Sequence, residues 1–380
     1  MFTYEFLQNY WWAIISLLGG LLVFLMFVQG GNSLIFITKD EEERQLIVNS
    51  TGRKWEFTFT TLVTFGGAFF ASFPLFYSTS FGGAYWVWIL LLVTFVFQAV
   101  SYEFQTKLGN LLGRNTFRTF LLINGCLGPF IVGAAVSTFF TGSDFIVNKA
   151  AVGESLAPTI SVWGNEWHGL EALANPFTIV FGLTVMFLTQ VLGGMYMQGS
   201  IEDERLEEKL VRAVRWTSGL FLAAFLACMA MLLTMPGYAV DSAGVISVEE
   251  YKYLHDFIQT PSVAIIFLLG VLFVLLGIGI QFFGRRKRIS IWLTGAGTVP
   301  AVMSLFLIAG YNGTAYYPSC SDLQSSLTIS NSCSSEFTLR TMAWVSLAIP
   351  FVLAYIFFAW RAIDRRRLTR REMEITEDKY

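Results

Sequence analysis

Histidine, cysteine and charge are all scarce in this sequence. Its 380 residues include two His and four Cys, and 14% of them are charged, against roughly 25% in an ordinary soluble protein. Two imidazoles, and cysteines without a CxxC spacing, are too few for a conventional metal cluster or a disulfide framework. Hydrophobic residues make up 54% of the chain and Phe occurs 37 times. A water-soluble globule is therefore excluded, because most of the surface must face lipid.

Nine apolar runs are long enough to cross a bilayer as helices, for which about 20 residues each are needed. They cover residues 11–38, 57–78, 83–101, 119–140, 175–198, 215–235, 262–283, 289–310 and 340–362. The first run is not expected to be a cleaved signal peptide, because no basic residue precedes it and it is too long. The sequence predicts one membrane domain over residues 1–380, an all-α integral membrane protein. We expect two four-helix bundles plus one peripheral helix, although the internal similarity is too short to establish a repeat.

Basic residues are distributed unevenly between the segments that join these runs. Of the 25 Lys and Arg, 22 lie in segments 39–56, 102–118, 199–215, 284–288 and 361–380. The alternate segments hold only Lys149, Lys252 and Arg340. Because Lys and Arg concentrate in cytoplasmic loops, the N-terminus is predicted to lie outside and the C-terminus in the cytoplasm. The basic tail, 361–380, is expected to bind anionic membrane lipids, and no nucleic-acid role is expected.

The last outer loop, residues 311–339, holds Cys320 and Cys333. In an oxidising compartment the two thiols are candidates for a disulfide, although two free thiols remain an alternative. Both histidines, His168 and His255, also fall in outer loops. No span therefore offers an imidazole to a haem or a metal, and we expect neither haem ligands, metal ligands nor catalytic residues in this chain alone.

Several polar groups share one depth, in the cytoplasmic third of the first three spans. They are Gln29 and Asn32 in the first span, Trp55 and Glu56 at the start of the second, and Gln98, Tyr102 and Glu103 at the end of the third. A carboxylate at the rim can take a proton from water, and amides can hold ordered water that passes it deeper. The alternative is that Glu56 only stabilises a helix start and that the amides join helices by hydrogen bonds.

A series of short motifs occurs in the order found in one known family. They are Tyr4-Glu5 with Trp11-Trp12, Asn49-Ser50, Trp55-Glu56, Gly66-Gly67-Ala68 to Pro74, Tyr102-Glu103 with Lys107, Asn175-Pro176-Phe177, Leu339 to Met342 with Trp344 and Val345, and Pro350 to Tyr355. Over nearly its whole length the chain resembles subunit II of the cytochrome bd type quinol oxidases. The resemblance implies a haem-free nine-helix partner of a subunit I that carries two b-type haems, one d-type haem and the quinol site.

The resemblance further implies a heterodimer in the bacterial cytoplasmic (inner) membrane that oxidises a quinol, reduces oxygen to water and draws protons from the cytoplasm. Small accessory subunits and bound lipids are also possible partners. Glu56 and Glu103 match acidic residues of the family. Gln29 and Asn32, however, stand where the family often has two Asp, and Gln98 replaces an Arg. Since amides cannot titrate, a route that begins at Glu56, beside Trp55, is the better candidate.

Two other functions remain open at this stage. Polar groups within spans and glycine-interrupted helices also suit a secondary transporter of a small solute. A purely structural assembly subunit differs from the oxidase interpretation only in whether Glu56 and Glu103 affect turnover. The sequence does not distinguish ubiquinol from menaquinol.

Overall fold

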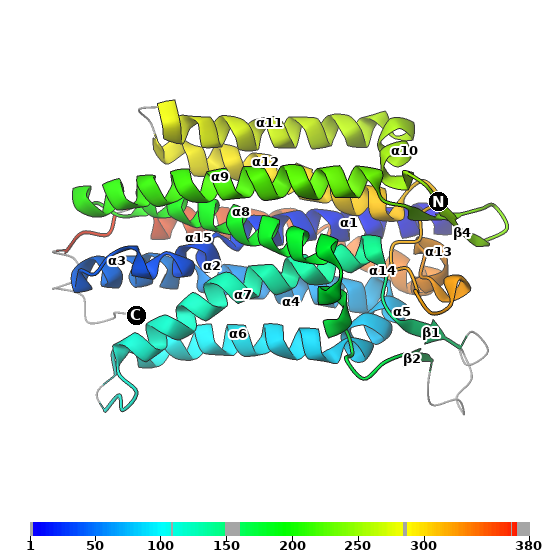
Figure 1. The fold of residues 1–380 in the computed structure, drawn as a ribbon, viewed down its shortest axis with the longest axis horizontal. Helices are drawn as coiled ribbons and strands as arrows, with labels where there is room; N and C mark the ends of the chain where they lie inside the picture. The colour runs from blue at the N-terminus through cyan, green and yellow to red at the C-terminus, as the bar shows by residue number, and fades with distance from the viewer. Residues whose placement is uncertain (1–2, 108, 149–159, 284–286, 366, 371–380) are drawn as a thin grey trace.

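The computed structural model describes residues 3–107, 109–148, 160–283, 287–365 and 367–370. Long helices run side by side along one axis, and two small hairpins and most of the loops lie at one end (Figure 1). Outside the described residues lie Lys149, residues 284–286 and, in the predicted tail, Arg366 and residues 371–380.

The helices account for most of the described chain. The longer ones are α1 Tyr4–Leu25, α3 Glu41–Gly52, α4 Trp55–Ser72, α6 Tyr85–Phe104, α7 Arg114–Thr141, α8 Pro176–Ser200, α9 Glu204–Thr234, α11 Pro261–Phe283, α12 Ser290–Gly310, α14 Glu336–Ser346 and α15 Ile349–Ile363. The shorter ones are α2 Phe27–Ser33, α5 Pro74–Phe76, α10 Lys252–Gln259 and α13 Ile329–Ser332, with a π-helix at Tyr77–Gly83. Strands β1 Phe145–Val147 and β2 Ser161–Trp163 form one antiparallel pair, and β3 Gly237–Val240 and β4 Ile246–Glu249 form another.

Within the described residues, eight helical stretches are long and apolar enough to cross a membrane, and a bent pair brings the number to nine. The bent pair is Glu41–Ser72 with Pro74–Gly83, which meet at 115°. The prediction of an integral membrane protein is confirmed, and within the predicted second span, 57–78, the helix is broken at Phe73. Proline has no amide hydrogen and disfavours helix in the residue before it, so α4 stops at Ser72 and the chain turns at Phe73.

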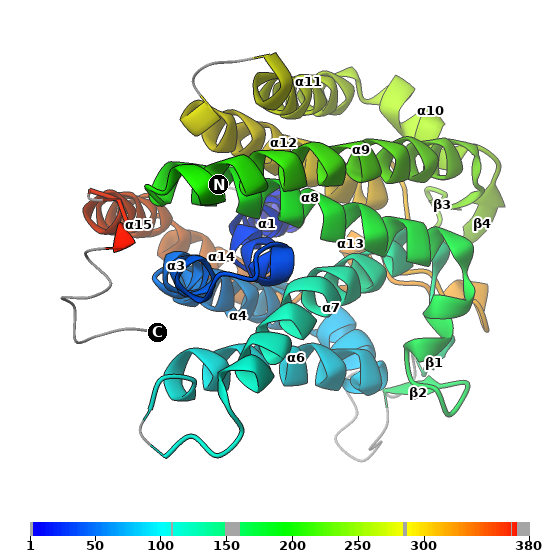
Figure 2. The ribbon, with the colours of Figure 1, turned by 60° about the vertical axis from the view of Figure 1, so that its left-hand side comes forward.

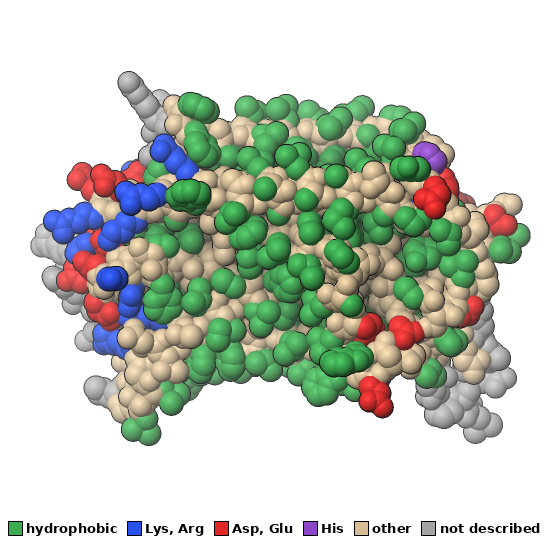
Figure 3. All heavy atoms as spheres, in the orientation of Figure 1, with side chains coloured by type: hydrophobic (Ala, Val, Ile, Leu, Met, Phe, Trp, Pro, Cys, Tyr) green, Lys and Arg blue, Asp and Glu red, His purple; other side chains and the backbone are tan. Residues whose placement is uncertain are grey.

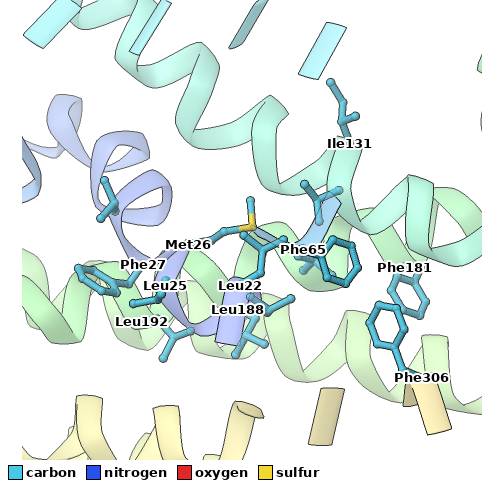
Figure 4. Packing of buried hydrophobic residues seen from close by; sticks show 14 of the residues in the cluster. Leu22, Leu25, Met26, Phe27, Phe65, Ile131, Phe181, Leu188, Leu192 and Phe306 are labelled. Atoms are coloured by element: carbon cyan, nitrogen blue, oxygen red, sulfur yellow. The ribbon is translucent and has the colours of Figure 1, made fainter. Parts of the chain in front are cut away.

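Helices α1 and α2 lie at the centre of the molecule. Figure 2 shows α4, α6 and α7 on one side of α1, and α8, α9, α11 and α12 on the other. In the same view α15 lies at the margin, and α14 lies between α15 and α1. Trp12 on α1 is fully buried and its Nε1 donates to the Phe306 carbonyl of α12 at 2.9 Å. Side chains of α1, α4, α8 and α12, among them Leu22, Phe65 and Leu188, pack together in one apolar core (Figure 4).

Helices α2 and α8 approach so closely that only glycine fits between them. A β-carbon on Gly30 would lie 1.7 Å from the Thr189 carbonyl oxygen, and one on Gly193 would lie 2.2 Å from the Gly31 nitrogen. Small residues of this kind let helix backbones touch in membranes, where van der Waals packing drives association. The crossing fixes the position of α2 along α8.

The two ends of the molecule differ in charge. On the face shown in Figure 3, Lys and Arg gather at the end where α3 lies, whereas the charged groups in view at the other end are acidic, with one His. We call the first the basic end; it holds α3, the first turns of α7 and α9 and the last turn of α15. α1 begins at the opposite end, the acidic end.

Candidate functional site

A cluster of buried polar side chains lies near the basic end, where α2, α3, α6 and α7 meet. Gln29 Nε2 donates to Gln98 Oε1 at 3.0 Å, and the Tyr102 hydroxyl donates to Asn32 Oδ1 at 2.7 Å and lies 3.0 Å from Thr51 Oγ1. All five side chains are at least 98% buried. The structure therefore brings together the three amides that the sequence placed at one depth.

A sixth member of the cluster, Asn124 of α7, was not anticipated from the sequence. A β-carbon on Gly128 would lie 3.6 Å from Asn124 Nδ2 and 3.9 Å from Gln29 Cγ, so the Asn124 side chain lies beside Gln29. We call Gln29, Asn32, Thr51, Gln98, Tyr102 and Asn124 the amide cluster. An Asn in the middle of an apolar span was the available signal, because such groups rarely face lipid.

The amide cluster is only half satisfied by protein groups. Gln29 Oε1, Asn32 Nδ2, Gln98 Nε2 and both polar atoms of Asn124 are buried without a hydrogen-bond partner among the described residues. Each such atom costs about 1–3 kcal/mol if it stays unpaired. Ordered water is the usual partner of buried polar groups in folded proteins. The cluster has the composition of a hydrated site.

The predicted carboxylates do not join this cluster. Glu56 is exposed at the start of α4, although the ring of its neighbour Trp55 lies 6.2 Å from that of Tyr102. Glu103 has 60% of its side chain exposed and pairs with Lys107, one turn along α6, at 3.2 Å. Exposed pairs of this kind contribute about 0–1 kcal/mol. The carboxylates of Glu56 and Glu103 thus lie apart from the buried amides.

The outward face of α4 carries small and polar groups rather than large apolar ones alone. Glu56, Thr60, Thr64 and Gly67 are all exposed at spacings of three or four residues, which places them on one side of the helix. A β-carbon on Gly67 would meet nothing within 4 Å. We call these four residues the α4 stripe.

A buried ion pair joins the start of α4 to the end of α15. Lys54 is fully buried, and its Nζ lies 3.2 Å from Asp364 Oδ1 and donates to the Trp360 carbonyl at 3.2 Å. The same ammonium lies 4.4 Å from the centre of the Trp360 ring, and the Tyr196 hydroxyl donates to Asp364 at 3.3 Å. This pair was missed from the sequence, where the signal was a single Asp within the basic run that follows α15.

The described part of the tail binds protein groups, and its predicted contact with membrane lipid stays a prediction. Arg367 donates to the carbonyls of residues 198 and 199 at 3.1 Å each, and Leu368 pairs with residues 200 and 202 through backbone hydrogen bonds. Arg370 lies 2.6 Å from both Asp203 and Glu42. Burial alone would raise the pKa of Asp203, but hydrogen bonds from Arg370 and the Leu206 amide hold it below its usual value.

The acidic end contains both predicted disulfide candidates, and the structure has them as free thiols. Cys320 Sγ donates to the Thr141 carbonyl at 3.6 Å. Cys333 Sγ lies 3.0 Å from the Tyr4 hydroxyl and accepts from Gln8 Nε2 at 2.9 Å. The two thiols thus have separate partners, at the end of α7 and the start of α1, and the Cys320–Cys333 disulfide stays a prediction.

Both histidines have partners at the acidic end. His168 Nδ1 lies 2.8 Å from the Gly83 carbonyl and its ring lies 4.3 Å from Tyr85, while His255 Nδ1 lies 2.7 Å from Glu249. Within the described ranges, no group of three or more His, Cys, Asp and Glu is placed to hold a metal ion.

Taken together, a bundle of apolar helices with one basic end and a buried amide cluster defines a polytopic α-helical membrane protein. Comparison with known proteins then gives its family. The chain belongs to the cytochrome bd terminal oxidase subunit II family, whose model matches residues 7–363. It is thus a subunit of an oxidoreductase complex that depends on haem at the level of the whole complex, and membership favours the oxidase interpretation over the secondary transporter.

Individual relatives cover almost the whole chain. It is 26% identical over 398 residues to the cytochrome bd-I ubiquinol oxidase subunit 2 of Escherichia coli strain K12, covering 98% of each protein. It is 23% identical over 385 residues to the cytochrome bd ubiquinol oxidase subunit 2 of Bacillus subtilis strain 168, covering 96% of this chain and 98% of that protein. A chain in the solved structure of the bd oxidase from Geobacillus thermodenitrificans has the same fold, with a TM-score of 0.62, 13% identity and coverage of 94% and 98%.

Proposed function

We propose that this chain is the haem-free subunit II of a bacterial inner-membrane quinol oxidase, with its basic end in the cytoplasm. Its family membership supports a partner subunit I, which would hold the two b-type haems, the d-type haem and the quinol site. The complex would oxidise a quinol and reduce oxygen to water. The chain itself would support subunit I and contribute to the uptake of protons from the cytoplasm. The distribution of Lys and Arg supports this orientation.

The face that meets subunit I is proposed to be formed by the α4 stripe and α14. The two helices are in contact, and Leu339 and Ser346 are the only buried side chains of α14 in this chain. Polar and small residues on an outward face pack poorly against lipid but well against another helix. An α4 stripe that carries a carboxylate, two hydroxyls and a glycine therefore favours a protein partner over lipid.

Proton uptake is proposed to begin at Glu56. It is the only acidic residue in α4, and it lies exposed at the basic end of the α4 stripe. Protons taken from cytoplasmic water would then enter at the edge of the subunit interface. The amide cluster would hold ordered water behind it, because Trp55 packs against Tyr102 and because the cluster has unpaired polar atoms. Glu103 would act only as a collector of protons at the surface.

The docking face can be tested with a matched pair of substitutions. Gly67→Trp places a large ring in open space on the α4 stripe, so the chain should fold but fail to copurify one to one with a haem-bearing protein. Gly219→Trp is the control, because Gly219 is exposed on α9 and a β-carbon there also meets nothing within 4 Å. Normal haem content in complexes with Gly67→Trp would contradict the proposed face.

Proton uptake can be tested separately. Glu56→Gln keeps size and hydrogen bonding but cannot ionise, so steady-state oxygen consumption with a quinol should slow while assembly and the haem spectrum stay normal. Glu56→Asp should be milder, and Glu103→Gln should have a smaller effect than Glu56→Gln. Wild-type turnover of Glu56→Gln from pH 6 to 9 would show that Glu56 serves only the helix start.

A further inference from the structure

A groove opens at the basic end between α8, α12 and α15. Its volume is about 740 Å³, and its walls combine aromatic rings with cationic side chains. Trp292, Phe357 and Phe358 are exposed on its apolar side, and Arg288, Arg361 and Arg365 are exposed around it. The groove thus has an apolar wall and a positively charged rim, and it lies at the end of α15.

The described lining of the groove carries more positive than negative charge. Within the described ranges, none of Arg288, Arg361 and Arg365 forms an ion pair. The one acidic residue that lines the groove, Asp364, is already engaged by buried Lys54. Burial, and next the charge of Arg288, lower the pKa of nearby Arg367, so a fourth cation lies in the same field, where Glu202 and Glu207 oppose this shift only in part. Such a concentration of guanidinium groups attracts an anion.

A second observation points to a ligand rather than to open water. Trp360 lines the groove and is 94% buried, yet its Nε1–H has no hydrogen-bond partner among the described residues. Buried indole N–H groups normally find an acceptor. Because this N–H is enclosed, a phosphate oxygen beside the arginines would reach it once the neighbouring rings shift, and acyl chains would cover the exposed rings.

We propose that this groove binds one acidic phospholipid of the cytoplasmic leaflet, with its phosphodiester on the arginines and its acyl chains on the aromatic wall. Two features favour this occupant over a soluble anion. The apolar wall is continuous with the lipid-exposed surface of α15, and a basic pocket between membrane helices on the cytoplasmic side suits lipid headgroups. Apart from the orientation of the basic end, the proposal does not depend on the proposed role of the chain in proton uptake.

The test uses the whole complex, stripped of lipid in neutral detergent, and native mass spectrometry with added phosphatidylglycerol or phosphatidylethanolamine. Wild-type complex should retain one phosphatidylglycerol at least tenfold more tightly than the zwitterionic lipid. Arg361→Gln and Arg365→Gln should each weaken retention about fivefold, the size expected for one basic group at an anionic bilayer surface. The double variant should lose about 25-fold.

Matched controls separate this site from general surface charge. Lys107→Gln and Arg114→Gln remove two exposed basic residues from the same end of the molecule, and they should leave retention unchanged. Trp360→Phe keeps a smaller aromatic ring but removes the N–H, and should weaken retention two- to fivefold without changing the haem spectrum. Each of three results would overturn the proposal: equal retention of the two lipids, full retention by the double variant, or displacement of the lipid by millimolar inorganic phosphate. The last would indicate a site for a soluble anion.

Discussion

The buried Lys54–Asp364 pair leads to an asymmetric prediction. Asp364→Asn leaves the Lys54 ammonium fully buried without a counter-charge, whereas Lys54→Met leaves Asp364, whose side chain is 28% exposed, partly solvated and hydrogen-bonded to Tyr196. Removing one partner of a buried pair costs roughly 3–5 kcal/mol. Because of that partial exposure we expect about 3 kcal/mol for Asp364→Asn and only about 1 kcal/mol for Lys54→Met. The double variant Lys54→Met with Asp364→Leu should lie close to wild type, since neither charge is then buried.

The assay is thermal unfolding of the purified complex in detergent, followed by labelling of Cys228, which is 4% exposed in the folded chain. A loss of 3 kcal/mol corresponds to a fall in Tm of about 5 °C, scaled from roughly 2–4 °C per kcal/mol in smaller proteins. Glu103→Gln is the control and should not shift Tm, because its pair with Lys107 is exposed. If Lys54→Met proves as damaging as Asp364→Asn, the cost does not come from an unpaired buried ammonium.

Three further predictions concern other contacts. Gly30→Ala should abolish assembly, since its β-carbon would overlap the α8 backbone, whereas Gly199→Ala, with nothing within 4 Å, should assemble normally; the yield of haem-bearing complex measures both. Asp203→Asn keeps the cap of α9 but loses the charge partner of Arg370, so trypsin should cleave the tail sooner. Because the pKa of Asp203 is lower in the folded chain, its charge stabilises the fold above the unfolded pKa of 3.8, and this stabilisation is lost as the pH falls through the folded pKa. The free energy of unfolding of wild type should therefore fall in this acid range, and that part of the fall should be absent in Asp203→Asn. Gln29→Met should slow turnover without lowering Tm if the amide cluster carries water, and unchanged turnover would assign the amide to packing alone.

Hydropathy marks the apolar runs, but the ends of the helices do not coincide with the ends of those runs. The predicted run 215–235 is α9 Glu204–Thr234, and 119–140 is α7 Arg114–Thr141. Both helices extend at the basic end beyond the apolar run, because a helix that leaves the hydrocarbon can continue through charged residues that hydropathy assigns to a loop. The opposite occurs in the second run, where a proline inside an apolar stretch ends the helix. The division into two four-helix bundles stays a prediction.

The sequence indicates the depth at which the polar residues lie in the spans, but not the direction in which their side chains point. Counting residues along a span places Gln29, Asn32 and Gln98 at one level, and the structure joins the first to the third. Which way each side chain points depends on how the helices are rotated against one another, and a single sequence does not contain that rotation. Glu56 shares the level yet faces outward. Pairs such as Lys54 with Asp364, 310 positions apart, depend on the completed packing of helices.

The glycine crossing of α2 and α8 has a mechanical consequence for the amide cluster. Gly30 is held against the backbone of α8 with no side chain in between, while Gln29 and Asn32, on either side of the Gly30–Gly31 pair, bond to side chains of α6. Because the backbones of α2 and α8 are in contact, α2 cannot shift along its axis or rotate about it without a steric clash. The side chains of Gln29 and Asn32 are therefore held at one depth and in one orientation. Any water chain along them would therefore have fixed anchor points on α2, and motion of α2 itself would require α8 to move as well.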